Sequence, residues 1–459
     1  MDNAPPVQKK TADNLVFLFW PEEGNSLCHT SKKKDIMMTN HITQPLVLDS
    51  QKVSGWHVAM IVIGVAITLP AFLIGSEIMG ALGARQGSFA ILTGGVILAV
   101  IASACMYIAV CKRQTTYQLL NASFGSLGSR GVSFLISVTL LGWFGVTVSL
   151  FGQAAARSME ELFSVQLPFE FYVMAGCLVM TGTTIYGFHA IDILSKFTVP
   201  FMLLILVAGV YFVSSNFSWA QIWTTPATGA GGIATFGGAV SVVVGSFMVG
   251  MTILPDISRF INRKEQVYVA SLGSFGSVFA FILIMAGLPV LMTGEKSLIN
   301  AMYQSGLGVP ALVMMIFASW TTNVSNLYSS SLGLAQVFPK IRGERITVMA
   351  GLLGGMMAVS GIMDYLIGFL VLLGIFIPPV AGIYIAHFFW RCRECTTAIS
   401  GSAFLSWGLA SGLALMTSSN VFTLTTVSAL DSFLTATLCY GVISKACVLW
   451  PRSQPSDGC

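Results

Sequence analysis

Charged residues are too scarce in this chain for a water-soluble fold. Of its 459 residues only 9% are charged, whereas 55% are hydrophobic. A soluble domain carries roughly 25% charged residues, because most of its surface faces water. Most of the surface of this chain must therefore face lipid. A helix that crosses a membrane needs about 20 apolar residues, so we expect an all-helical integral membrane protein with about ten to twelve spans.

Twelve apolar runs, each bounded by polar residues or by Gly and Pro, divide the sequence. Each run is long enough for one spanning helix, within a few residues at either end. The predicted spans cover residues 57–82, 87–111, 131–156, 170–188, 195–214, 233–256, 267–293, 309–337, 346–362, 365–390, 402–419 and 424–447.

The distribution of Lys and Arg predicts how these spans are oriented. If the N-terminus lies inside, twenty of the 23 Lys and Arg residues fall in cytoplasmic segments, and only Arg85, Arg157 and Lys296 fall outside. Such an excess is the signal of the positive-inside rule. Removal of one span would invert every later loop and destroy the asymmetry. We therefore predict twelve spans in the cell inner membrane, with both termini in the cytoplasm.

Two polar tails flank the predicted spans. Residues 1–54 and 449–459 are expected to be cytoplasmic. The first 36 residues are Lys-rich and lack periodicity, and Met37 or Met38 offers a second start. This leader is either a disordered tail or an over-extended reading frame, and no function is assigned to it.

Two predicted spans contain residues that can interrupt a helix near mid-membrane. The first holds Gly64, Pro70 and Gly75, and the sixth holds Gly245-Ser246-Phe247 followed by Gly250. Pro removes a backbone donor and Gly loosens a helix. Unpaired backbone groups at membrane depth survive only where they line a cavity or are buried in protein. Because Gly is also common in ordinary membrane helices, the pattern alone leaves simple packing open.

Spans one and six hold corresponding positions in two halves of five helices. Broken helices at corresponding positions indicate an inverted-repeat transporter whose binding site lies at the breaks. We therefore predict a first repeat at 55–214, a second repeat at 215–390, and two additional helices at 391–448.

The eighth span carries a polar stripe. Its members recur at steps of three and four residues, so they share one face of a helix. A face this polar either lines a cavity or hydrogen-bonds to other helices. Two Asn within four residues favour the cavity, because an amide offers paired donors and acceptors. The stripe consists of Ser319, Thr322, Asn323, Asn326 and Ser330.

Other functional classes find little support in the sequence. The nine Cys have irregular spacing and the five His are scattered, which provides neither a disulfide framework nor a catalytic arrangement. The dispersed basic residues form no nucleic-acid-binding patch, and no charged ring or filter-like repeat indicates a channel. We expect no enzyme and no organic cofactor. A non-transporting membrane sensor is the alternative from another class.

Five motifs stand in colinear order between about residues 55 and 450. They are Leu141-Gly142-Trp143-Phe144-Gly145-Val146, Val243-Val244-Gly245-Ser246-Phe247, Asp256-Ile257-Ser258-Arg259-Phe260, Trp320-Thr321-Thr322-Asn323 with Leu327-Tyr328 and Leu332-Gly333, and Ile377-Pro378-Pro379-Val380. Together they resemble the cytosine permeases of the nucleobase–cation symporter-1 family, also called the purine–cytosine permease family.

The resemblance implies the leucine-transporter fold, with two inverted repeats of five helices and with helices one and six broken. It also implies secondary active transport of a nucleobase with a cation, by alternating access. Trp143 and Phe247 would then enclose the planar base, which suits offset aromatic stacking. Ser246 and Asn323 would hydrogen-bond to the edge of the base.

The resemblance also implies a sodium site beside the first break. Its ligands would be backbone carbonyls near Gly64, Ile67 and Ala318 and the hydroxyls of Thr321 and Thr322. Ligation by oxygen atoms alone suits a hard cation.

Proton coupling is the alternative to sodium. It needs a titratable group inside the membrane, and the predicted spans offer the carboxylates of Glu77 and Asp431. Both can instead lie near the outer interface, so sodium is the leading expectation.

One departure from the family pattern concerns the choice of substrate. The family has Gln three residues before the Trp of span three, where this chain has Leu140. It has an acidic residue and then Asn after Asn323, where this chain has Val324 and Ser325. A site without that Gln should discriminate less well or select a base with fewer polar edges. We include Leu140, Ser325 and Asn326 among the predicted substrate contacts.

Cytosine or a closely related nucleobase is the leading substrate. A hydroxymethylpyrimidine, a purine, uracil, allantoin or a hydantoin are the alternatives. The expected partners are this small molecule and membrane lipids, without nucleic acid, and a monomer is the expected state.

Overall fold

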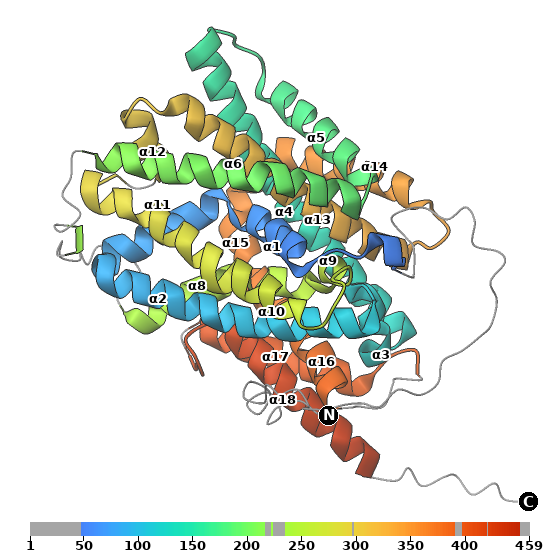
Figure 1. Ribbon diagram of the computed structural model, residues 1–459. Coiled ribbons are helices and arrows are strands. Elements are labelled where there is room, and N and C mark those ends of the chain that lie inside the picture. The colour runs from blue at the N-terminus through green and yellow to red at the C-terminus, as the bar shows by residue number, and fades with distance from the viewer. Residues whose placement is uncertain are drawn as a thin grey trace, which may run out of the picture. The chain divides into compact units, whose positions relative to one another are not determined.

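The computed structural model (Figure 1) describes residues 47–215, 222–223, 235–295, 298–390, 397–419 and 421–449. Within these ranges all regular secondary structure is helical, apart from one parallel bridge between Val53 and Ile261. Lys296 and most of the two predicted tails lie outside the described residues. The described part of the chain therefore has the all-α fold that its composition predicts.

Long helices alternate with short connecting ones. In chain order they are α1 (Gly55–Ala66), α2 (Leu69–Lys112), α3 (Thr116–Phe124), α4 (Ser126–Phe163), α5 (Phe169–Ile185), α6 (Phe188–Ser214), α8 (Phe236–Ile253), α9 (Pro255–Ser258), α10 (Gln266–Ser271), α11 (Ala280–Thr293), α12 (Leu298–Gln304), α13 (Gly308–Val337), α14 (Gly343–Val359), α15 (Leu366–Phe376), α16 (Pro378–Phe389), α17 (Gly401–Ser418) and α18 (Ser428–Leu449). The 3-10 helices η2 (Asp49–Gln51) and η4 (Ile362–Tyr365) and the π-helical segment η3 (Leu272–Phe279) join them.

The helices and the predicted spans overlap without matching one to one. Among the described residues, seven helices are long and apolar enough to cross a membrane. One of them, α2, contains 44 residues, or about 66 Å at 1.5 Å per residue, which is twice the hydrocarbon thickness of about 30 Å. At Gly83 its backbone leaves helical geometry, with φ 75° and ψ 171°, a conformation that glycine adopts readily.

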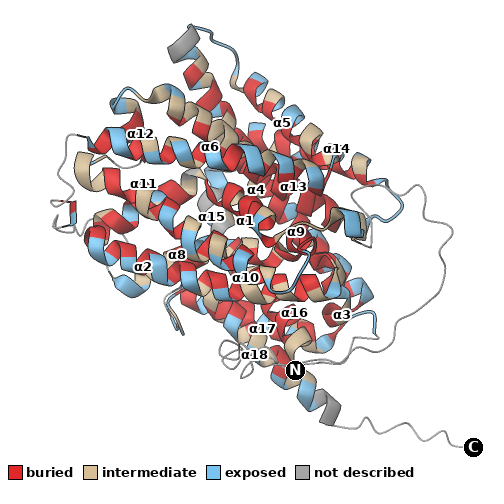
Figure 2. Ribbon diagram, viewed as in Figure 1, coloured by how far each residue is buried: buried red, intermediate tan, exposed pale blue. Residues whose placement is uncertain are grey.

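Large apolar side chains lie on the outside of the molecule. Val100 on α2, Leu178 on α5 and Phe197 on α6 are 65%, 67% and 72% exposed. Figure 2 shows exposed positions in pale blue along these helices. Extensive apolar exposure is rare on soluble monomers and suits a hydrocarbon environment, as expected for a multi-pass membrane protein.

The helical path of the first predicted span is interrupted between α1 and α2. α1 ends at Ala66, and Ile67 and Thr68 have non-helical backbone angles before α2 begins. Thr68 caps the new helix, because its Oγ1 accepts a hydrogen bond from the backbone N of Ala71 at 3.4 Å. Pro70 lies in the first turn of α2, where its missing N–H leaves no helical hydrogen bond unmade.

The sixth predicted span is continuous where the sequence suggested a break. Residues 245–247 are α-helical within α8, and the chain turns only at Leu254, before α9. The predicted position of this break is therefore wrong. A Cβ atom at Gly245 would lie 3.4 Å from Cγ1 of Val427, in the loop between α17 and α18, which is an ordinary contact distance.

A close crossing of α2 and α11 leads to a stability prediction. A Cβ atom at Gly75 would lie only 2.2 Å from the carbonyl oxygen of Leu283. Gly75→Ala should force the helices apart at a cost of about 1–3 kcal/mol and lower the melting temperature in detergent. Gly80→Ala is the control, because its Cβ would meet nothing nearer than Cγ1 of Val290 at 3.9 Å. Equal melting temperatures for the two variants would contradict this packing.

Candidate functional site

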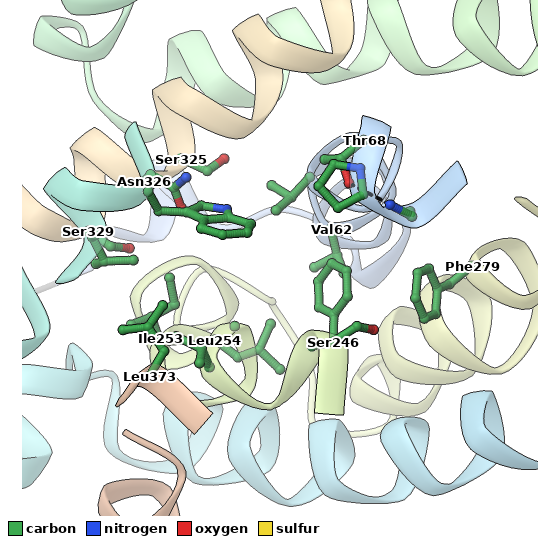
Figure 3. Close-up of a pocket in the computed structure, with 18 of the residues that line it drawn as sticks. Val62, Thr68, Ser246, Ile253, Leu254, Phe279, Ser325, Asn326, Ser329 and Leu373 are labelled. Carbon is green, nitrogen blue, oxygen red and sulfur yellow. Dashed lines mark hydrogen bonds between the residues drawn. The ribbon is translucent and has the colours of Figure 1, made fainter. Parts of the chain in front are cut away.

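A cavity of about 360 Å³ lies where the α1–α2 interruption meets α4, α8, η3 and α13 (Figure 3). Small-molecule sites measure about 300–1,000 Å³, so the cavity can hold a small ligand. Six of the seven residues that the sequence predicts to contact substrate line it. They are Leu140, Trp143, Ser246, Phe247, Ser325 and Asn326.

Asn323 is the seventh, and it lies outside the cavity lining. Its side chain is fully buried. Its Nδ2 donates to the carbonyl of Phe144 at 3.4 Å and to Sδ of Met180 at 3.2 Å, while its Oδ1 accepts from Oγ1 of Thr147. These contacts join α13 to α4 and α5. The amide of Asn323 therefore holds helices together, which is the other role that the polar stripe left open.

The polar face that α13 turns to the cavity is rotated from the predicted stripe. Ser325, Asn326 and Ser329 line the cavity. Of these three, only Asn326 belongs to the predicted polar stripe, whereas Ser325 was predicted separately as a substrate contact. Ser330 instead donates to the carbonyl of Ser137 on α4 at 3.1 Å. Ser329 was not among the predicted residues, although its place one turn after Ser325 is a signal that could have found it.

Two aromatic side chains reach the cavity from different helices. Trp143 on α4 stacks on Phe369 of α15, with ring centroids 6.4 Å apart and planes at 26°. Phe247 on α8 meets Phe275 and Phe279 of η3 edge to face, at 5.2 and 5.0 Å. Each ring is thus supported by a neighbour and also forms part of the cavity wall, an arrangement that can accept a flat heterocycle.

Two polar groups in the cavity wall lack a hydrogen-bond partner among the described residues. They are Oγ of Ser325 and Nδ2 of Asn326, and both are buried. The hydroxyls of Thr68 and Ser246 are already engaged, the first as the cap of α2 and the second with the carbonyl of Val243 at 2.7 Å. Because buried polar groups are nearly always paired, the two free groups are available to a bound molecule.

The predicted cation ligands meet where the end of α1 contacts α13. Oγ1 of Thr321 lies 2.9 Å from the carbonyl oxygen of Gly64 and 3.1 Å from that of Ala318. Oγ1 of Thr322 lies 3.4 Å from the carbonyl oxygen of Val65. Four of the five predicted residues therefore take part in one cluster of oxygen atoms.

Ile67, the fifth predicted ligand, caps the C-terminus of α1 and is fully buried. The end of a helix leaves carbonyl groups without intrahelical partners. Carbonyl and hydroxyl oxygens are the donors that a hard cation prefers, so the residues present fit a sodium ion.

The two carboxylates considered for proton coupling differ in their surroundings. Glu77 on α2 is exposed. Asp431 on α18 is fully buried and accepts hydrogen bonds from five donors in residues 417–425. These hydrogen bonds tie the carboxylate of Asp431 to the preceding loop, which it anchors.

Two further buried carboxylates were not predicted from the sequence. Asp192 on α6 is 3% exposed and forms an ion pair of 2.7 Å with Lys196. Asp256 on α9 is fully buried and accepts a hydrogen bond from the backbone N of Thr116 at 2.8 Å. Both lie at or near the ends of predicted spans, where the hydropathy pattern does not distinguish burial from exposure.

The sequence matches a known family over most of its length. A family model described as "Permease for cytosine/purines, uracil, thiamine, allantoin" matches residues 48–406. The cytosine permease of Escherichia coli strain K12 is 29% identical over 368 residues, which cover 77% of this chain and 82% of that protein. The cytosine permease of Escherichia coli O157:H7 shows the same identity and coverage.

Solved transporter structures share the fold. Mhp1, a nucleobase-cation-symport-1 family transporter, in a closed conformation with bromovinylhydantoin bound, gives a TM-score of 0.77 at 18% identity, covering 89% of this chain and 96% of that chain. A Na⁺-coupled sialic acid symporter in a substrate-bound outward-open state gives 0.65 at 11% identity, covering 86% and 90%. At such identities the likeness concerns the fold alone.

The family assignment rests on the extent of the match together with the fold. Residues 48–406 make up well over half of the 459-residue chain. The all-helical, apolar architecture and the cavity at the interrupted helix agree with a small-molecule carrier. The chain therefore belongs to the family of permeases for cytosine and purines, uracil, thiamine and allantoin, and it is a membrane transporter rather than an enzyme.

Proposed function

We propose that the protein imports cytosine or a closely related nucleobase by sodium symport. The observation that carries this proposal is the cavity itself. It combines two supported aromatic rings, Trp143 and Phe247, with the free polar groups of Ser325 and Asn326. The cytosine permeases among its relatives and the hydantoin bound to Mhp1 support a flat, nitrogen-containing heterocycle as the substrate.

The proximity of the oxygen cluster to the cavity supports sodium as the coupling ion. Both sites use the end of α1 and α13: Val65 lines the cavity, and its carbonyl is the acceptor for Thr322. Gly64, Ile67, Ala318, Thr321 and Thr322 would hold the ion. Ordering of the α1–α2 interruption by one ligand would favour binding of the other, so the coupling is reciprocal.

The proposed transport cycle is alternating access in a twelve-span inverted-repeat fold. Residues 55–214 and 215–390 form the two repeats, 391–448 add two helices, and both termini lie in the cytoplasm at the inner membrane. A four-helix bundle rocks against the remaining helices and opens the cavity to each side in turn. Because the cavity is formed within one chain, a monomer is sufficient.

Two alternatives within this function concern substrate and ion. The substrate can be another heterocycle, such as a hydroxymethylpyrimidine, a purine, uracil, allantoin or a hydantoin. Proton coupling is the second candidate for the driving ion. It is favoured by Asp256, whose Oδ2 is buried without a hydrogen-bond partner among the described residues.

Uptake by cells that lack their own nucleobase carriers tests the proposal. Radiolabelled cytosine should enter only when sodium is present. Thr321→Val removes a hydroxyl worth about 1.4 kcal/mol, so the sodium concentration for half-maximal uptake should rise about tenfold. Thr347→Val is the matched control, because the hydroxyl of Thr347 donates to the carbonyl of Gly343 within its own helix, α14, at 3.1 Å. A sodium dependence unchanged by Thr321→Val would remove the proposed ion site.

A further inference from the structure

The polar side chains of α13 line one side of the cavity. α13 contributes Ser325, Asn326 and Ser329. In Figure 3 these three side chains lie together at one end of the cavity, while Val62, Thr68, Ser246 and Phe279 lie at the other. The hydroxyls of Thr68 and Ser246 are already hydrogen-bonded within the protein, so α13 is the main source of hydrogen bonds to a ligand.

Within this wall, two polar groups are free to hydrogen-bond to a ligand. Nδ2 of Asn326 and Oγ of Ser325 have no partner among the described residues. A carboxamide carries a donor and an acceptor side by side, so its natural counterpart is an edge with the same adjacent pair. A lactam edge (N–H beside C=O) or an amidine edge (ring N beside NH₂) has this pattern.

The remaining walls are mostly apolar, with Thr68, Thr139 and Ser246 as their polar side chains, and none of the cavity-lining residues is charged. Val62 and Val65 of α1, Leu140 of α4, Ile253 of α8 and Leu373 of α15 represent these walls. A charged ligand would lose its hydration without gaining a counter-charge, which is strongly unfavourable.

We propose, on the basis of the nucleobase transport proposed above, that this cavity selects a neutral planar heterocycle with one amide-type edge against α13 and an apolar, alkyl-substituted opposite edge. In a pyrimidine that pairs through its N3 edge, carbons 5 and 6 point away from α13. A methyl group on that carbon edge is buried against apolar side chains, which tightens binding about fourfold. A carboxylate on the same edge abolishes binding.

Binding to the purified full-length protein in detergent tests this selectivity. Isothermal titration compares uracil with thymine, and cytosine with 5-methylcytosine, in saturating sodium. Orotate and thiamine supply an anion and a cation. The methylated base of each pair should bind about fourfold more tightly than its parent, and neither charged compound should bind.

Equal or tighter binding of the unmethylated bases would overturn the selectivity while leaving nucleobase transport in place. Comparable binding of orotate or thiamine would overturn it as well. If none of the neutral bases binds to a protein that melts cooperatively, the selectivity and the proposed function both fail.

Variants on α13 test the assignment of the polar edge. Asn326→Ala should weaken binding of uracil and thymine alike, by about tenfold, and leave their affinity ratio unchanged. The melting temperature without ligand should not fall, because the free amide nitrogen forms no bond that the variant removes. Loss of the thymine preference in Asn326→Ala would contradict the division of the cavity into a polar and an apolar side.

A matched pair of serines provides the control. Ser325 and Ser331 are both buried on α13 with hydroxyls that lack a partner among the described residues, but only Ser325 lines the cavity. Ser325→Ala should weaken base binding about threefold, whereas Ser331→Ala should leave it unchanged. Equal effects of the two substitutions would show that the free hydroxyl of Ser325 does not meet the ligand.

Discussion

Trp143→Ala should abolish measurable uptake while the protein still inserts into the membrane. The indole lines the cavity and is held by stacking on Phe369 at 6.4 Å. Truncation of a buried aromatic anchor costs about 2–3 kcal/mol of binding, which is about a 30- to 150-fold loss of affinity. The measurement is the initial rate of cytosine uptake, normalised to the amount of protein in the membrane.

Trp143→Phe is the control for this result. A phenyl ring keeps a planar face toward the ligand, so uptake should be reduced by about tenfold or less. A melting curve in detergent separates loss of binding from loss of folding, because Trp143 is only half-buried and supports the cavity wall from one side. Normal uptake by Trp143→Ala would exclude the stacking role of this residue.

Asp431→Asn should have the largest effect on stability. The carboxylate accepts hydrogen bonds of 2.5–3.1 Å from the hydroxyls of Thr417, Thr423 and Thr425 and from the backbone N of Leu424 and Thr425. An amide removes the charge and turns one acceptor into a donor that faces other donors. Each buried group left unpaired costs about 1–3 kcal/mol. The melting temperature in detergent should fall by about 5 °C or more.

Glu77→Gln is the matched control for Asp431→Asn. Glu77 is an exposed carboxylate on α2, so neutralisation of its charge should change the melting temperature by less than about 1 °C. Asp431→Asn should also impair transport, because the loop that it anchors contacts α8. Within that loop, Oγ1 of Thr426 lies 3.1 Å from Oγ of Ser241. An unchanged melting temperature in Asp431→Asn would show that these hydrogen bonds do not hold the loop.

Much of the fold could be predicted because hydropathy reports directly on contact with lipid. Every predicted span overlaps a helix of the structure. The family resemblance assigned Trp143 to the substrate site, and the residue lines the cavity. The pairing of Gly64 with Thr321 followed from the family resemblance, and the structure brings these two residues together.

The errors share one physical cause: a sequence does not show which neighbour a helix face meets. Asn323 and Asn326 occupy one predicted stripe, yet Asn323 turns to α4 and α5 and only Asn326 reaches the cavity. Phe275 and Phe279 also form part of the cavity wall, and nothing distinguishes them among 31 Phe. The helix α8 also continues through Gly245, where the glycines suggested a break.

For the same reason, the sequence could not show which carboxylates are buried and could therefore serve proton coupling. The sequence suggested two carboxylates, of which Glu77 is exposed and Asp431 anchors a loop. Burial of Asp192 and Asp256 arises from tertiary contacts with other elements. Such contacts become visible only when the helices are assembled.

Cytosine accumulation by purified protein in sealed proteoliposomes tests the central claim most directly. With an inward sodium gradient and equal pH on both sides, internal radiolabelled cytosine should rise above its external concentration. It should fall back to equality when an ionophore collapses the gradient. Accumulation that follows a proton gradient in sodium-free buffer, or equilibration without accumulation by a folded protein, would contradict sodium symport.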